Sequence, residues 1–85
     1  MDTLEKYREQ MNCIDQEMAR LFLQRMKLSI QIGDYKKEKR LPIFQKERED
    51  IVLEKVKQIA STTEEKKYME DFFLYLMKLS KEVQK

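Results

Sequence analysis

Apolar residues in the first half of the chain recur every three or four positions, which is the spacing of one helix face. This stripe runs from Leu4 to Tyr35 and is interrupted by one charged residue, Arg25. Pro42 cannot continue a helix, and the residue before a proline disfavours helical geometry. The pattern therefore predicts a first helix from about Thr3 to Lys39.

Two shorter helical stripes follow the proline. The first predicts a helix from about Lys46 to Ala60. The segment Ser61–Glu65 then offers two overlapping capping boxes, which predict a third helix from near Thr63 to the end of the chain. One glycine and one proline in 85 residues agree with helix throughout. We expect an all-α fold of three helices in a single domain, residues 1–85.

The first predicted helix is too long for a compact chain of this size. It would extend about 55 Å at 1.5 Å per residue, whereas a compact 85-residue domain has a radius of gyration of about 12 Å. The two later helices are too short to cover both ends of its apolar stripe. We therefore expect an intertwined homodimer with two-fold symmetry. An ordinary long coiled coil would also explain the apolar repeat.

Polar residues fall within or beside the inward stripe of each helix. A buried Arg25 needs an anionic partner, because an unpaired buried charge costs several kcal/mol. Lys36 lies three helical turns further on, on the same face. Gly33 lies between them, either because of close packing or a ligand, or as a tolerated glycine. The later helices add four polar residues: Arg48, Glu49, Ser80 and Gln84.

These polar residues have two interpretations. Singly, each is better explained by an ion pair or by the polar end of a helix. Together they predict a pocket lined by cations and neutral donors, with one carboxylate. Such a pocket suits a small dianion that carries a hydroxyl group.

Composition limits the chemistry further. The chain has no histidine and one cysteine, Cys13, so we expect neither a zinc cluster nor an internal disulfide. Its 18 basic and 16 acidic residues are closely mixed, which argues against a nucleic-acid partner. No apolar run approaches the ~20 residues of a membrane span, and we see no secretion signal. We expect a cytoplasmic protein that needs no cofactor.

Five groups of residues also carry a likeness to a known family. They are Tyr7–Gln10 with Ile14–Asp15, Leu23–Met26, Ile32–Lys36, Leu41–Ile43 with Arg48–Glu49, and Ser80 with Gln84. In this order and spacing they resemble the all-helical class of chorismate mutases, type II. The resemblance implies interlocked long helices in a homodimer. It also implies the rearrangement of chorismate to prephenate, a step in phenylalanine and tyrosine biosynthesis.

The resemblance implies roles for individual residues as well. Arg25 looks like the clamp on one substrate carboxylate, and Lys36 and Gln84 look like the donors to the ether oxygen. Arg8 looks like the residue that reaches the other carboxylate from the partner chain. Seventeen helical residues, about 25 Å, separate Arg8 from Arg25, so a small ligand cannot bridge them within one chain.

Four further substrate-binding positions follow from the resemblance. They are Glu49 for the ring hydroxyl, Arg48 next to it, Ser80 for a carboxylate, and Gln45. The family usually has aspartate at the position of Gln45, and an amide is a weaker acceptor than a carboxylate.

Two alternatives to the mutase remain open. An isochorismate-pyruvate lyase shares the fold and uses a similar dianion. A non-catalytic helical dimer or regulatory module would also keep the fold, although its inward polar residues would then be unnecessary. The rearrangement itself moves no proton and needs no covalent intermediate, which agrees with the absence of histidine.

Overall fold

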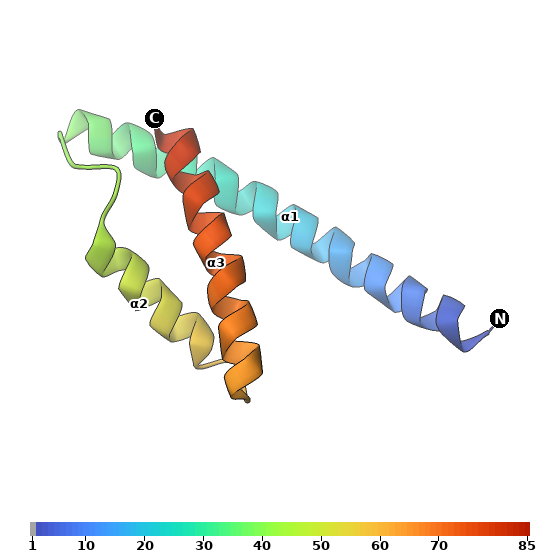
Figure 1. Cartoon of the computed structure of the whole chain (residues 1–85). Helices are drawn as coiled ribbons and strands as arrows, with labels where there is room; N and C mark the ends of the chain where they lie inside the picture. The colour runs from blue at the N-terminus through green and yellow to red at the C-terminus, as the bar shows by residue number, and fades with distance from the viewer. Residues whose placement is uncertain (1) are drawn as a thin grey trace.

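The computed structural model describes residues 2–85 as three helices, α1 (Thr3–Glu38), α2 (Lys46–Lys57) and α3 (Thr63–Gln84). α2 and α3 form an antiparallel hairpin, and α3 crosses the C-terminal half of α1 (Figure 1). The N-terminal half of α1 projects away from the hairpin. The radius of gyration is therefore 16.2 Å, well above the ~12 Å of a compact chain. The predicted all-α fold of three helices is confirmed.

Side-chain caps fix where α1 and α3 begin. The carboxylate of Asp2 accepts a hydrogen bond from the Glu5 amide at 2.8 Å. At α3, the Thr62 hydroxyl accepts from the Glu65 amide (3.0 Å), and the Glu65 carboxylate accepts from the Thr62 amide (3.1 Å). This capping box was one of the two predicted. The other predicted capping box paired Ser61 with Glu64. In the structure, the Ser61 amide instead donates to Glu65, at 2.8 Å.

All three predicted helix ends differ from the structure, and α3 ends at Gln84, one residue before its predicted end. α1 ends one residue early, and Arg40 takes a left-handed φ of 57° in the following turn. α2 ends at Lys57, three residues before the predicted Ala60. Its last turn tightens through i→i+3 bonds, from the Ile59 amide to Val56 and from the Ala60 amide to Lys57. Ile59 continues the apolar period but is 76% exposed, so packing does not extend the helix.

The core of the chain lies along α3. Within residues 2–85, α3 packs against both other helices, whereas the backbones of α1 and α2 do not approach each other closely. Two of the buried side chains are apolar, Leu76 and Met77, and two are polar, Ser29 and Gln84. A Cβ atom on Gly33 would lie 2.7 Å from the Cα of Gln84, so close helix packing explains this glycine.

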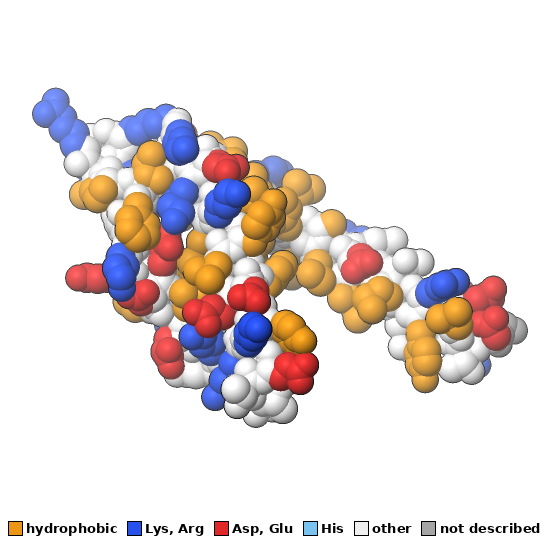
Figure 2. Space-filling model, viewed as in Figure 1, with side chains coloured by type: hydrophobic (Ala, Val, Ile, Leu, Met, Phe, Trp, Pro, Cys, Tyr) orange, Lys and Arg blue, Asp and Glu red, His pale blue; other side chains and the backbone are white. Residues whose placement is uncertain are grey.

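The apolar stripe of the projecting part of α1 is uncovered in the single chain. Apolar side chains stand out along this arm (Figure 2). Between 46% and 64% of their surface is exposed at Leu4, Tyr7, Met11, Ile14 and Met18. Even so, no helix within residues 2–85 is both long and apolar enough to cross a membrane.

Candidate active site

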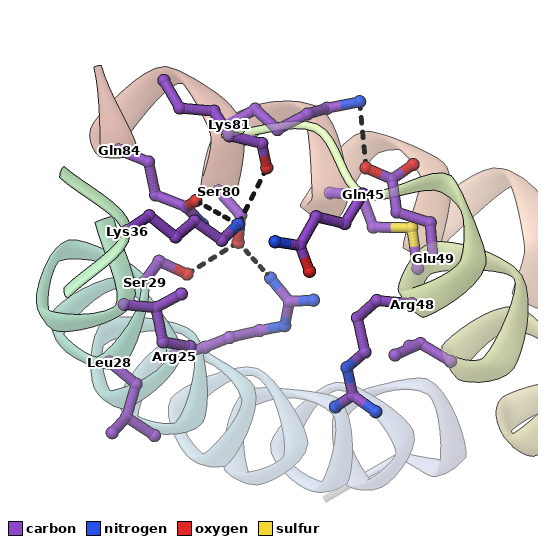
Figure 3. Close-up of a pocket in the computed structure, with 14 residues that line it drawn as sticks. Arg25, Leu28, Ser29, Lys36, Gln45, Arg48, Glu49, Ser80, Lys81 and Gln84 are labelled. Carbon is purple, nitrogen blue, oxygen red and sulfur yellow. Dashed lines mark hydrogen bonds and ion pairs between the residues drawn. The ribbon is translucent and has the colours of Figure 1, made fainter. Parts of the chain in front are cut away.

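A cavity of about 440 Å³ lies where the C-terminal half of α3 faces α1 and α2. Seven of the eight predicted site residues line it: Arg25, Lys36, Gln45, Arg48, Glu49, Ser80 and Gln84. The close-up shows all seven around one space (Figure 3). The exception is Arg8, which is exposed on the projecting part of α1 and does not line this cavity.

Ser80 contacts the Arg25 guanidinium, and Ser29 in turn contacts Ser80. Arg25 Nη1 donates to Ser80 Oγ at 2.6 Å and, more weakly, to the Leu76 carbonyl oxygen at 3.4 Å. The hydroxyls of Ser80 and Ser29 share a hydrogen bond of 2.7 Å, so α3 and α1 are joined at this point (Figure 3). Ser29 is buried and lines the same cavity. The remaining guanidinium N–H groups are left for a ligand.

The Arg25 guanidinium lies in an unfavourable electrostatic setting. Burial lowers its pKa from the ordinary value, and the positive charge of nearby Arg48 lowers it further. An arginine stays protonated despite such a shift. Two like charges that face one pocket therefore favour an anion between them.

Lys36 orients the amide of Gln84. Its ammonium donates to Gln84 Oε1 and to the Ile43 carbonyl oxygen, both at 2.8 Å. A lysine offers only donors, so the amide oxygen must face it, and the amide N–H groups stay available to a ligand. Burial lowers the pKa of Lys36, and the carboxylate of Glu49 opposes this by raising it.

One carboxylate lines the cavity, and it belongs to Glu49. Glu49 Oε2 lies 3.1 Å from Lys81 Nζ, which places an ion pair between α2 and α3. Gln45 lies beside Glu49, and its Nε2 makes a long contact of 3.4 Å to the Pro42 carbonyl oxygen. We call Gln45 and Glu49 the carboxylate end of the cavity.

Three of the cavity's cations lack a carboxylate partner. The ion pairs found in residues 2–85 involve Glu17, Asp50, Glu70 and Glu49, paired with Arg20, Lys46, Lys57 and Lys81 respectively. Arg25, Lys36 and Arg48 take part in none of these pairs. The cavity therefore presents positive charge that a small dianion could balance.

The sequence-based prediction missed two polar residues of the cavity, Ser29 and Lys81. Ser29 lies one helical turn after Arg25 on the stripe that leads to Lys36, so its spacing could have revealed it. Lys81 follows Ser80 and lies three residues before Gln84. Its position gave a weaker signal, because lysine on a surface helix is usually solvated.

Comparisons with known proteins identify the family and the fold. A profile of the family described as chorismate mutase type II matches residues 7–85. A bifunctional chorismate mutase/prephenate dehydratase from Aquifex aeolicus (strain VF5) is 39% identical over 56 residues, or 66% of this chain. The match spans only 16% of that relative's length. A conserved hypothetical protein from Pyrococcus furiosus has a similar structure, with a TM-score of 0.84, 28% identity, and coverage of 100% of this chain and 99% of that one.

Proposed function

Because the chain belongs to the chorismate mutase type II family, we propose that it catalyses the rearrangement of chorismate to prephenate in phenylalanine and tyrosine biosynthesis. The whole chain would act as one domain of this kind. The observation that carries the proposal is the cluster of unpaired cations, Arg25, Lys36 and Arg48, beside the oriented amide of Gln84 in one cavity. A dianion with an ether oxygen matches both the charge and the donors.

The reaction sets two tasks for the protein. Within one molecule, the ether C–O bond breaks while a new C–C bond forms, and no atom leaves. The substrate must be held in the compact shape in which the two ends meet, and such positioning can supply much of the rate gain. We assign this holding to the guanidinium of Arg25, which Ser80 keeps in one orientation at 2.6 Å.

Negative charge grows on the ether oxygen as its bond to carbon breaks. Donors that are fixed before the reaction stabilise this charge without reorganisation. Lys36 and Gln84 are suited to this role, because their mutual hydrogen bond of 2.8 Å fixes the direction of both groups. Losing one such donor in other enzymes costs about 2.7–4 kcal/mol of transition-state stabilisation.

The carboxylate end of the cavity would accept a hydrogen bond from the ring hydroxyl. Glu49 Oε1 remains available there, because the ion pair with Lys81 uses Oε2. Gln45 can add an amide oxygen, a weaker acceptor than the aspartate usual at this position. Arg48 lies next to Glu49 in the sequence and supplies further positive charge to the same space.

A second copy of the chain would complete the site. The angle between α1 and α3 encloses an apolar groove of about 570 Å³, lined among others by Met18, Phe22 and Phe73. Arg25 lines both this groove and the polar cavity. An antiparallel α1 from a second copy would cover the exposed stripe and bring Arg8 of the partner subunit toward Arg25. We propose this homodimer with shared sites as the working form.

One assay tests the proposed activity. Purified protein is supplied separately with chorismate and with isochorismate, and the products are identified. Prephenate from chorismate is the expected result. Pyruvate from isochorismate alone would instead favour the lyase, and no turnover of either would favour a non-catalytic module.

Matched variants exclude a contaminating enzyme. Lys36→Ala removes a donor from the cavity and should lower kcat/KM by about 10²–10³. Lys37→Ala removes the neighbouring lysine, whose ammonium donates to the Lys85 carbonyl oxygen outside the cavity. The Lys37 variant should match the parent. Equal activity of both variants and the parent would show that the activity does not come from this cavity.

A further inference from the structure

Lys81 has no part in the proposed mechanism, yet its ammonium is fixed at the carboxylate end of the cavity. It lies 3.1 Å from Glu49 Oε2 and 4.7 Å from the centre of the Phe44 ring. The ion pair and the cation–π contact hold it from two sides. Both side chains of the pair are mostly buried, at 33% exposed for Lys81 and 20% for Glu49. Lys81 lines the cavity, and Figure 3 shows its ammonium beside the Glu49 carboxylate.

The ion pair with Lys81 determines which hydrogen-bond donors of a ligand can bind to the Glu49 carboxylate. A lone carboxylate accepts a hydrogen bond from a hydroxyl and attracts an ammonium group more strongly, because the latter adds a full positive charge. A carboxylate that already faces an ammonium still has a free oxygen for a hydroxyl. A second cation beside it would meet the repulsion of the first.

No other group of the cavity offsets this repulsion. Gln45, which completes the carboxylate end, carries no charge. The remaining ionisable lining residues, Arg25, Lys36 and Arg48, are all cations. An amine on a ligand, protonated at neutral pH, would therefore enter a region whose single negative charge is already paired.

We propose that Lys81 is a specificity-determining residue, which makes the carboxylate end select a neutral hydroxyl and reject an ammonium group at the same position of the ligand. The proposal rests on the proposed function, since it assumes that the ring hydroxyl of the substrate lies at Glu49. It adds that the protein discriminates between chorismate and the analogue in which an amine replaces that hydroxyl.

The test compares kcat/KM for these two compounds at neutral pH in four proteins. They are the parent, Lys81→Met, Lys81→Arg and Lys78→Met. Methionine keeps roughly the length of the side chain without its charge, and its sulfur can still contact an aromatic ring. Arginine keeps the charge. Lys78 is the matched control, because it is an exposed lysine of α3 that also lies over an aromatic ring, 5.8 Å from the centre of Tyr75, outside the cavity.

The expected result is a higher kcat/KM for the amine analogue when the charge of Lys81 is removed. In Lys81→Met, kcat/KM for the amine should rise about tenfold, since a like charge has been removed from its site. Lys81→Arg and Lys78→Met should keep the parent's preference. A merely structural role for Lys81 would instead lower kcat/KM for both compounds together.

Each outcome separates this proposal from the function on which it rests. If the parent converts chorismate and Lys81→Met shows no gain with the amine, the role of Lys81 is refuted while the mutase function stands. If the parent converts neither compound, the proposed function itself fails. Lys81→Gln serves as a second neutral variant, and circular dichroism confirms that each protein is folded.

Discussion

The two halves of α1 share one helical geometry and have opposite surroundings. In the N-terminal half, apolar residues such as Ile14 are about half exposed, at 54%. In the C-terminal half, α3 buries a serine and a glycine, while Arg25 and Lys36 face the cavity. The chain thus leaves apolar residues exposed and covers polar ones. This difference supports our proposals that the first half contacts a second copy of the chain and that the second half contacts a ligand.

The largest expected effect comes from placing a charge in the apolar half. Ile14→Glu should abolish the folded dimer at micromolar concentration, since an uncompensated buried charge costs roughly 3–5 kcal/mol. Gln16→Glu adds the same charge off the apolar stripe and should behave like the parent. Sedimentation and circular dichroism measure both. An Ile14→Glu protein that is folded and sediments like the parent would show that nothing covers this face.

Mixing two inactive variants tests whether the N-terminal half of α1 in one chain and the C-terminal half of α1 in another contribute to the same site. Arg8→Ala and Arg25→Ala should each lower kcat/KM by at least about a hundredfold, because each removes a proposed clamp on the substrate. When the two proteins are unfolded and refolded together, mixed dimers carry one intact site. About a quarter of the parent activity should return.

The control for this experiment is each variant refolded alone, which should stay inactive. Mass spectrometry under native conditions shows whether mixed dimers have formed. Mixed dimers without regained activity would mean that Arg8 does not act across the two chains.

The cavity beside the C-terminal half of α1 should respond to pH when the donor that α3 supplies becomes a carboxyl group. Gln84→Glu should lower kcat/KM by about 10²–10³ near neutral pH, where the carboxylate accepts hydrogen bonds and repels the growing charge. Activity should recover as the pH falls and the carboxyl group is protonated, a change whose reference pKa is about 4.3. Gln84→Met removes the donor at every pH and should show no such recovery. Activity of Gln84→Glu that rises with pH would exclude Gln84 as the ether-oxygen donor.

A smaller effect should follow when α3 is pushed away from α1. An alanine at position 33 would place its Cβ 2.7 Å from the Gln84 backbone, so the end of α3 must shift. We expect Gly33→Ala to lower kcat/KM about tenfold by displacing the amide, although alanine favours helix by about 1 kcal/mol over glycine. Asp34→Ala, at the next and exposed position, should leave kcat/KM unchanged. Unchanged kinetics in Gly33→Ala would mean that the contact does not position Gln84.

The smallest expected effect is a shift in the pH at which kcat/KM falls on the alkaline side of its profile. Burial lowers the pKa of Lys36, and Glu49 raises it. Activity that needs the ammonium is full below this pKa and is lost as the pH rises through it. Removing the negative charge in Glu49→Gln should therefore move the alkaline limb of kcat/KM to lower pH. Glu82→Gln, on the exposed side of α3, should leave it in place, and a limb that moves upward would contradict the assignment to Lys36.

Helical spacing predicted most of the fold and much of the cavity. The three-turn separation of Arg25 and Lys36 and the one-turn separation of Ser80 and Gln84 place all four side chains in one cavity. Their catalytic roles stay predictions. Periodicity works here because a straight helix fixes which residues share a face.

Other features depend on contacts that spacing does not encode. Ile59 continues the apolar period of α2, but the turn into α3 ends the helix before it. Lys81 was overlooked because charged residues make up 40% of the chain and mostly face solvent. Its position in the cavity follows from an ion pair between two helices. The role that we propose for Arg8 needs a second copy of the chain, whose position helical spacing within one chain does not fix.

The separation of α1 from α2 has a consequence for thermal stability. Within residues 2–85, the backbones of these helices are brought together only through α3. An anion that contacts Arg25 on α1 and Arg48 on α2 would link them directly, and the ligand would become part of the tertiary structure. A ligand at a hundred times its dissociation constant adds about 2.7 kcal/mol to the stability of the form that binds it. The melting temperature should therefore rise with the concentration of any dianion that fits the cavity, even one that cannot react.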